Sequence, residues 1–113
     1  MQSRASEVLQ KVKELRNLAN EVEQRLEKDG LSITNISKAQ LFDYNIKNII
    51  GAVESLLRNE PSEKPNLRLE KDLPDAYNNI KKIKETAPGR LNAQHLDRIH
   101  ELVSYFEQNY KRI

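Results

Sequence analysis

Cysteine is absent from this chain of 113 residues, which excludes disulfides, thiolate catalysis and cysteine-based zinc sites. Tryptophan is also absent and aromatic residues make up only 5% of the sequence, so few side chains could stack on bases or sugars. No apolar run is long enough to cross a bilayer, and the N-terminal residues lack the apolar stretch of a secretory signal. We therefore expect a cytoplasmic protein with no membrane span.

A strong excess of charge of one sign is missing as well. The 19 Lys and Arg residues and 17 Asp and Glu residues give a net charge of +2, which is a weak signal for nucleic-acid binding. Hydrophobic residues make up 37% of the chain, a share that is typical of slender helices with solvated outer faces. The length predicts one domain, residues 1–113, that can bury a core without crosslinks.

Apolar residues recur at alternating spacings of three and four in four segments, which is the pattern of amphipathic helices. The first segment predicts a helix over residues 4–29 and sustains the spacing for about three heptads. The second predicts a helix over residues 38–59, with Ser37 as its N-cap and Gln40 at the capping-box position. The apolar positions of these two helices are Ala5, Val8, Val12, Leu15, Ala19, Val22 and Leu26, followed by Phe42, Ile46, Ile49, Val53 and Leu56.

The two remaining helices are predicted over residues 73–86 and 93–112. Asp72 is the expected N-cap of the third helix, with Pro74 in its first turn, where a missing N–H costs little. Pro61 and Pro65 come before it and predict a longer connection over residues 60–72. Since none of the four apolar stripes can be buried alone, we predict an all-α fold, an antiparallel four-helix bundle.

One face of the second helix is nearly uncharged although 32% of the chain is charged. Tyr44, Asn48, Gly51 and Ser55 follow one another at spacings of four, three and four residues, so they form a stripe beside the apolar one. Such a stripe lets another backbone approach closely. It is either a docking surface for a partner or a second copy, or the boundary with a neighbouring helix of the same bundle. The second interpretation is the simpler one.

A basic cluster and a histidine motif give two weaker candidate sites. Lys81 and Lys84 share one helix face with Arg90 nearby, an arrangement that could contact a phosphate backbone. The segment RLNAQH, from Arg90 to His95, is similar in its spacing to the nuclease motif of HEPN-type helical RNases. The polar residue that usually follows the arginine in those enzymes is replaced here by Leu91. His95 and His100 are five residues apart, about 140° around a helix, so they do not predict a metal site.

The motifs therefore favour a protein-interaction or adaptor module without enzymatic activity, cofactor or metal, as a monomer or a homodimer. Its expected partner is another protein of unknown identity, bound at Tyr44, Asn48, Gly51 and Ser55. Three alternatives stay open: a nucleic-acid-associated accessory subunit using Lys81, Lys84 and Arg90, a HEPN-like RNase, and a toxin-neutralising protein. The last rests on a similarity in length, charge and predicted architecture to small bacteriocin-immunity proteins, without a shared motif.

Overall fold

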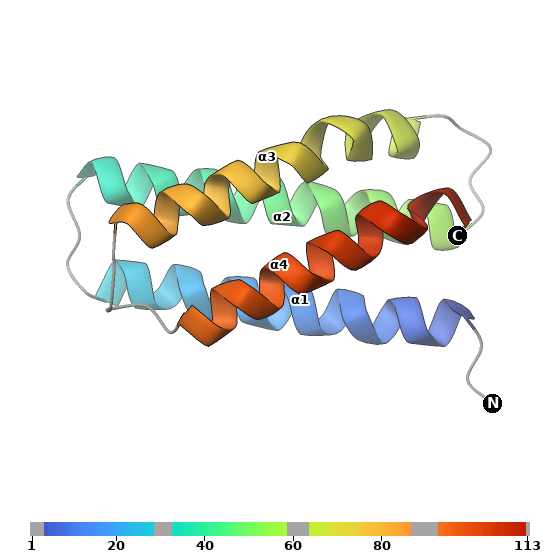
Figure 1. Ribbon diagram of the computed structural model, residues 1–113, viewed down its shortest axis with the longest axis horizontal. Coiled ribbons are helices and arrows are strands. Elements are labelled where there is room, and N and C mark those ends of the chain that lie inside the picture. The colour runs from blue at the N-terminus through green and yellow to red at the C-terminus, as the bar shows by residue number, and fades with distance from the viewer. Residues whose placement is uncertain (1–3, 29–32, 59–63, 87–92, 113) are drawn as a thin grey trace.

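The computed structural model describes residues 4–28, 33–58, 64–86 and 93–112, and these residues form helices without any strand (Figure 1). The helices are α1 (Arg4–Lys28), α2 (Ile33–Leu57), α3 (Lys64–Thr86) and α4 (Ala93–Asn109), and α4 continues into a single 3₁₀ turn, η1 (Tyr110–Arg112). This confirms the predicted all-α class.

The helices run alternately up and down, so that α1 begins and α4 ends at the same end of the molecule (Figure 1). Each helix packs chiefly on its neighbours in the chain, and α4 closes the bundle by packing on α1. The contact between α2 and α3 is the most extensive, whereas α4 crosses the other helices more obliquely. The fold is an antiparallel four-helix bundle, as the four apolar stripes predict.

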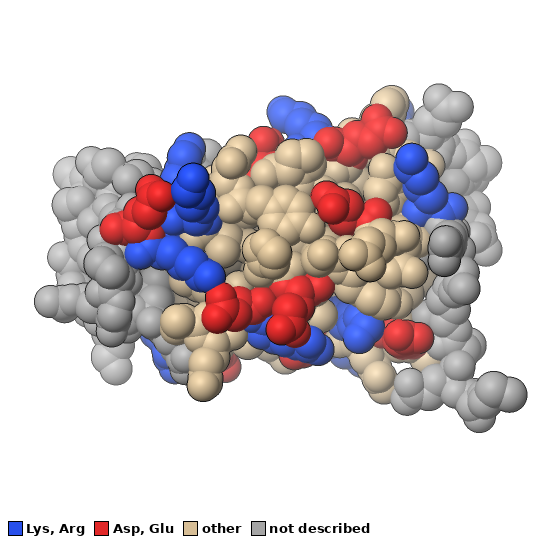
Figure 2. Space-filling model, in the orientation of Figure 1, with Lys and Arg blue, Asp and Glu red and all other residues tan. Residues whose placement is uncertain are grey.

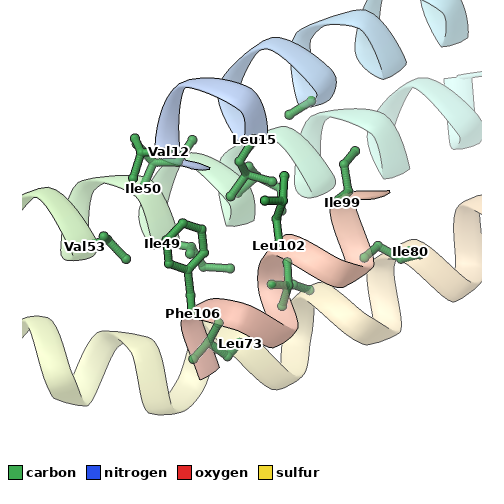
Figure 3. Packing of buried hydrophobic residues seen from close by; sticks show 14 of the residues in the cluster. Val12, Leu15, Ile49, Ile50, Val53, Leu73, Ile80, Ile99, Leu102 and Phe106 are labelled. Carbon is green, nitrogen blue, oxygen red and sulfur yellow. The ribbon is translucent and has the colours of Figure 1, made fainter. Parts of the chain in front are cut away.

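The core draws on all four helices. Figure 3 shows Leu15, Ile49, Leu73 and Leu102, one from each helix, pointing into the space between them. The largest side chains there are Phe42 and Phe106, both completely buried. The core residues of α1 and α2 are Val8, Val12, Leu15, Ala19, Val22, Phe42, Ile46, Ile49, Ile50, Ala52 and Val53. Except for Ala52, all of these lie in or beside the apolar stripes identified in the sequence, whereas Ala5 is exposed.

The third helix begins nine residues earlier than predicted, at Lys64 rather than residue 73. The expected connection over residues 60–72 is therefore wrong for residues 64–72, and Asp72 is a buried residue inside α3 rather than its N-cap. Pro65 is the second residue of the helix, where its missing N–H has no partner to lose. Pro74 lies in the helix interior, where it cannot donate to the carbonyl of Glu70. Burial of Leu69 and Leu73 on the core offsets that loss.

The second helix also begins earlier than predicted, at Ile33 rather than residue 38. Ser37 lies within α2, so its assignment as the N-cap is wrong. The sequence also predicts an N-cap at Asn92 and a helix end at Asp29–Gly30, and both lie outside the described residues. The predicted bounds of α1 and α4 agree with the structure to within a residue, counting η1 as the end of the fourth helix.

An ion-pair cluster joins α4 to α1 across the closing edge of the bundle. The guanidinium of Arg98 donates to both carboxylate oxygens of Glu14, at 2.7 and 2.8 Å, and to Glu101 at 2.9 Å. A two-pronged pair of this kind fixes the relative position of two helices better than a single contact. It adds to the burial of Leu96, Ile99, Leu102, Val103 and Phe106, which packs α4 on the core.

Candidate functional site

The stripe predicted on α2 faces outward. Tyr44 is 67% exposed, and Asn48, Gly51 and Ser55 are partly exposed. A Cβ atom built onto Gly51 would meet nothing within 4 Å. Another helix of this bundle therefore does not pack closely against Gly51, so the interpretation of the stripe as an internal helix boundary is wrong at this position. Whether a partner covers the stripe stays a prediction.

Charged residues lie at the sides of this stripe and are paired locally. Lys47 forms an ion pair with Asp43 at 2.6 Å, and Arg16 of α1 forms one with Glu54 at 3.1 Å. The hydrogen bond from Lys47 to Asp43 raises the pKa of the lysine. Arg58 also donates to Ser55 Oγ at 3.3 Å, so a charge lies at the C-terminal end of the stripe. Asn48 and Gly51 form its uncharged middle.

A groove of about 570 Å³ runs between α2 and α3, beside the stripe. Its walls carry three kinds of side chain: amides, ions of both signs, and two apolar residues that are largely exposed. The apolar residues are Tyr44 and Leu67, 67% and 60% exposed. The remaining lining residues are Asn45, Asn48, Arg68, Lys71, Asp72, Asp75, Asn78, Asn79 and Lys82. The α2–α3 groove therefore includes Tyr44 and Asn48 of the predicted surface but not Gly51 or Ser55.

Two buried polar residues connect the walls of the α2–α3 groove. Asn45 is 5% exposed and donates from Nδ2 to the backbone carbonyl of Asp72 at 2.9 Å. Its Oδ1 is buried without a hydrogen-bond partner among the described residues. Burial raises the pKa of the Asp72 carboxyl, and nearby Asp75 acts in the same direction, whereas the Asn45 amide, Lys71 and Arg68 lower it. One acceptor in the middle of the groove, Asn45 Oδ1, thus lacks a donor among the described residues.

The basic cluster is only partly brought together. Lys81 and Lys84 line a second, smaller groove of about 430 Å³ between α3 and α4, but Glu85 lies in the same groove. Lys84 is bound to Asp97 at 2.5 Å, which neutralises much of its charge. Arg90 lies outside the described residues. Figure 2 shows this face of the molecule, with mostly uncharged residues in its middle and charges of both signs around them.

The predicted nuclease pair cannot be assembled from the described residues, because Arg90 is not among them. His95 bonds through Nε2 to Glu21 of α1 at 2.5 Å, and its Nδ1 is buried without a described partner. His100 instead packs against the ring of Tyr77, with ring centroids 4.9 Å apart. No three His, Asp or Glu side chains in the described part of the chain group closely enough to hold a metal ion. The histidines therefore serve contacts between helices.

The α3 wall of the α2–α3 groove was missed in the sequence because residues 60–72 were assigned to a connection. From Arg68 to Lys82 its lining residues recur at helical spacing, beside the apolar stripe of Leu69, Leu73 and Ala76. That spacing could have predicted the α3 wall from the sequence. The exposure of Leu67 could not be predicted from the sequence, because it depends on how α3 is turned against the other helices.

Comparison with known protein families, with curated proteins and with solved structures finds no match for the chain. Within the described helices, none is both long and apolar enough to cross a membrane. The toxin-neutralising role stays a prediction, because no contact of the described residues bears on it. A function can therefore be inferred only from the chain's own surfaces.

Proposed function

We propose that this chain is a protein-interaction module that binds a partner protein over the α2–α3 groove and the adjoining stripe of α2. The proposal includes no catalytic step. The chain would act by presenting a rigid surface on two helices that share the most extensive contact in the bundle.

One observation carries this proposal. Only three large hydrophobic side chains in the described part of the chain are mostly exposed or nearly half exposed: Leu9, Tyr44 and Leu67. Two of them, Tyr44 and Leu67, come from different helices and line the same groove. Single exposed apolar residues are common on any surface, but two that converge on one groove are typical of docking sites. Tyrosine in particular contributes strongly to protein interfaces.

The stripe beside the groove supports the same surface. Gly51 offers an open, flat area where a partner's backbone could approach. The uncharged side chains of Asn48 and Ser55 could be covered at a smaller desolvation cost than ions. The α2 part of the proposed surface is therefore the stripe of Tyr44, Asn48, Gly51 and Ser55.

The proposal is tested by capturing partners from the native cell with three single variants of the chain. Tyr44→Ala and Leu67→Ala should each weaken partner binding by about tenfold, equivalent to about 1.4 kcal/mol. Leu9→Ala removes an exposed leucine of α1 that lies outside both grooves, and should leave binding unchanged. Circular dichroism should show the same helicity in all three variants.

Gly51→Lys provides a second test that does not depend on removing a contact. Because a Cβ added at this position meets nothing within 4 Å, the bundle should fold normally while the lysine blocks close approach of a partner. Loss of the captured partner, or of a homodimer, with full helicity is the expected result. An unchanged partner list and an unchanged oligomeric state for this variant and for Tyr44→Ala would rule the surface out.

A further inference from the structure

Two side-chain contacts fix how α3 and α4 lie beside each other. Lys84 pairs with Asp97 at 2.5 Å, and the Tyr77 side chain is hydrogen-bonded to Ser104. The α3 members of these contacts are seven residues apart, and so are the α4 members. Over this stretch the two helices therefore run side by side in opposite directions at the same rate, and the level of each residue along the bundle follows from its number.

Four charged side chains on these helices form no ion pair with any described residue. Lys81 and Glu85 are one turn apart on α3, and both line the α3–α4 groove. Glu107 reaches the same groove through its hydrogen bond to Tyr77, and Lys111 follows it after four residues. Along the chain, α3 thus has a cation followed by an anion, whereas α4 and its last turn have an anion followed by a cation.

Uncharged side chains lie between these charges. The half-buried ring of Tyr77 packs on the exposed ring of His100, and Ser104 beside them is partly exposed. Figure 2 shows this side of the molecule, with uncharged residues in the middle and charges of both signs around them. An uncharged, aromatic centre with a charged rim is the usual composition of a protein interface. We call this surface the α3–α4 face, and its residues are Tyr77, Lys81, Glu85, His100, Ser104, Glu107 and Lys111.

We propose that the α3–α4 face binds a second copy of this chain about a two-fold axis, so that α3 of each copy lies on α4 of the other. Two-fold dimers are the commonest assemblies of identical chains, and they require a surface that is complementary to itself. The inference goes beyond the docking function proposed above and uses a different surface. The α2–α3 groove and the stripe on α2 remain available to a partner protein in such a dimer.

The first pair of opposite charges places the axis. Levels along the bundle are measured from the contact of Lys84 with Asp97. At 1.5 Å per residue, Lys81 lies at about 4.5 Å and Glu107 at about 15 Å, so an axis at about 10 Å brings each opposite the other. Tyr77 lies at about 10.5 Å. The axis therefore passes through the uncharged middle of the face.

The second pair of opposite charges gives the same axis independently. Glu85 lies about 1.5 Å on the far side of the reference contact, and Lys111 lies about 21 Å on the near side, so their midpoint is again about 10 Å. One axis thus places Glu85 opposite Lys111 and Lys81 opposite Glu107. By symmetry each contact occurs twice, which gives four attractive contacts in the dimer and sets its orientation.

The size of the surface is sufficient for a specific but weak dimer. The molecule measures 42 by 30 Å across its broad side, and a standard interface covers about 800 Å² of each partner. Lys84 adds little net charge because Asp97 already neutralises it. Since exposed ion pairs contribute orientation more than affinity, we expect a dissociation constant in the micromolar range.

The test is sedimentation equilibrium of the intact chain over a wide range of protein concentrations. The unmodified chain should show a monomer–dimer equilibrium that weakens as salt is added, because salt screens exposed charges. Lys81→Glu and Glu107→Lys should each weaken dimerisation by about tenfold or more, since each places like charges together at two symmetric contacts. Mixing the two variants should restore the dimer, because both contacts of the mixed pair again join opposite charges.

Two control variants change charge elsewhere. Lys13→Glu reverses an exposed charge of α1 outside the α3–α4 face, and Gly51→Lys adds a charge on the α2 stripe. Both should dimerise like the unmodified chain, and circular dichroism should show equal helicity in all variants. Nuclear magnetic resonance spectra of the unmodified chain at low and high concentration give a readout without any substitution, and their differences should be centred on α3 and α4.

A chain that stays monomeric at every concentration would overturn the dimer. So would a dimer that survives both charge reversals, a mixture of the two variants that stays monomeric, or concentration-dependent changes centred on α1. If Gly51→Lys or Tyr44→Ala abolishes self-association while the charge reversals do not, the second copy occupies the α2 surface instead. Loss of partner capture in Tyr44→Ala is measured separately, so the docking function and the dimer can fail independently.

Discussion

Asp72 shows how a single buried residue couples the groove to the stability of the bundle. Burial raises the pKa of its carboxyl above the ordinary value of 3.8. The folded state thus favours the protonated form, and the stability that this group contributes is complete below its ordinary pKa. That contribution is lost as the pH rises through the raised pKa of the folded state.

Asp72→Asn should therefore stabilise the chain increasingly as the pH rises from about 3 towards neutral, relative to the unmodified protein. The measurement is the free energy of unfolding by urea at a series of pH values, with Glu70→Gln as the control for loss of one negative charge. A gain in stability that is largest in acid would contradict the assigned direction of the pKa shift.

At Gly51 the structure contradicts one interpretation of the sequence. The sequence raised the idea that a small residue here accommodates a neighbouring helix, but a Cβ would meet nothing within 4 Å. Gly51→Ala should then stabilise the free chain by about 0.5 to 1 kcal/mol, because alanine has the higher helix propensity. Chemical denaturation measures this, and a loss of stability would show that the bundle itself uses the missing side chain.

Helix α3 was the element least predictable from the sequence. Four prolines and mixed charges between residues 60 and 90 obscured a stripe that begins at Leu69. Proline in the interior of a helix costs about 3 kcal/mol, so placing Pro74 in the first turn was the reasonable expectation. The helix includes Pro74 because Leu69 and Leu73, which directly precede the two residues of the missing hydrogen bond, are buried. The burial of these two leucines therefore outweighs the low helix propensity of Pro74.

Replacing this proline restores a backbone donor. Pro74 is exposed, so Pro74→Ala removes no core contact and should stabilise the bundle by about 1 kcal/mol or more. The gain is expected in the midpoint of urea unfolding, with little change in its slope. A destabilised Pro74→Ala variant would mean that the fixed backbone angle of proline is needed for α3 to follow α2.

An ion pair between Glu14 and Arg98 links α4 to α1. The hydrogen bond from the guanidinium lowers the pKa of the Glu14 carboxyl below its ordinary value of 4.5. Its stabilising contribution is present above that value and is lost as the pH falls through the lowered pKa. Since both side chains are about 40% exposed, Glu14→Gln should cost no more than about 1 kcal/mol at neutral pH. The cost should vanish in acid, and a cost that persists there would point to packing rather than charge.

For the whole molecule, regular apolar spacing was sufficient to predict four helices and their antiparallel order. The apolar spacing of three and four residues fits a helix and not a strand. The structure buries residues of these stripes such as Val12, Ile46 and Ile99. The candidate site was not predictable to the same degree. Tyr44 and Asn48 were singled out, but their counterparts on α3 depended on which residues face each other across two helices, as Asn45 and Asp72 do.

The bundle also explains why the groove lies where it does. Because α2 and α3 pack along much of their length, the side chains at the edges of that contact form two continuous walls. The groove could not be built by one helix alone. The proposed docking surface thus depends on the packing of α2 against α3.

The most direct test of the docking surface is hydrogen exchange of the chain with and without its captured partner. Backbone amides between residues 44 and 55 and between residues 67 and 82 should exchange more slowly in the complex, while those of α1 and α4 should change little. Protection confined to α1 or α4, with the α2–α3 groove unchanged, would contradict the proposed function.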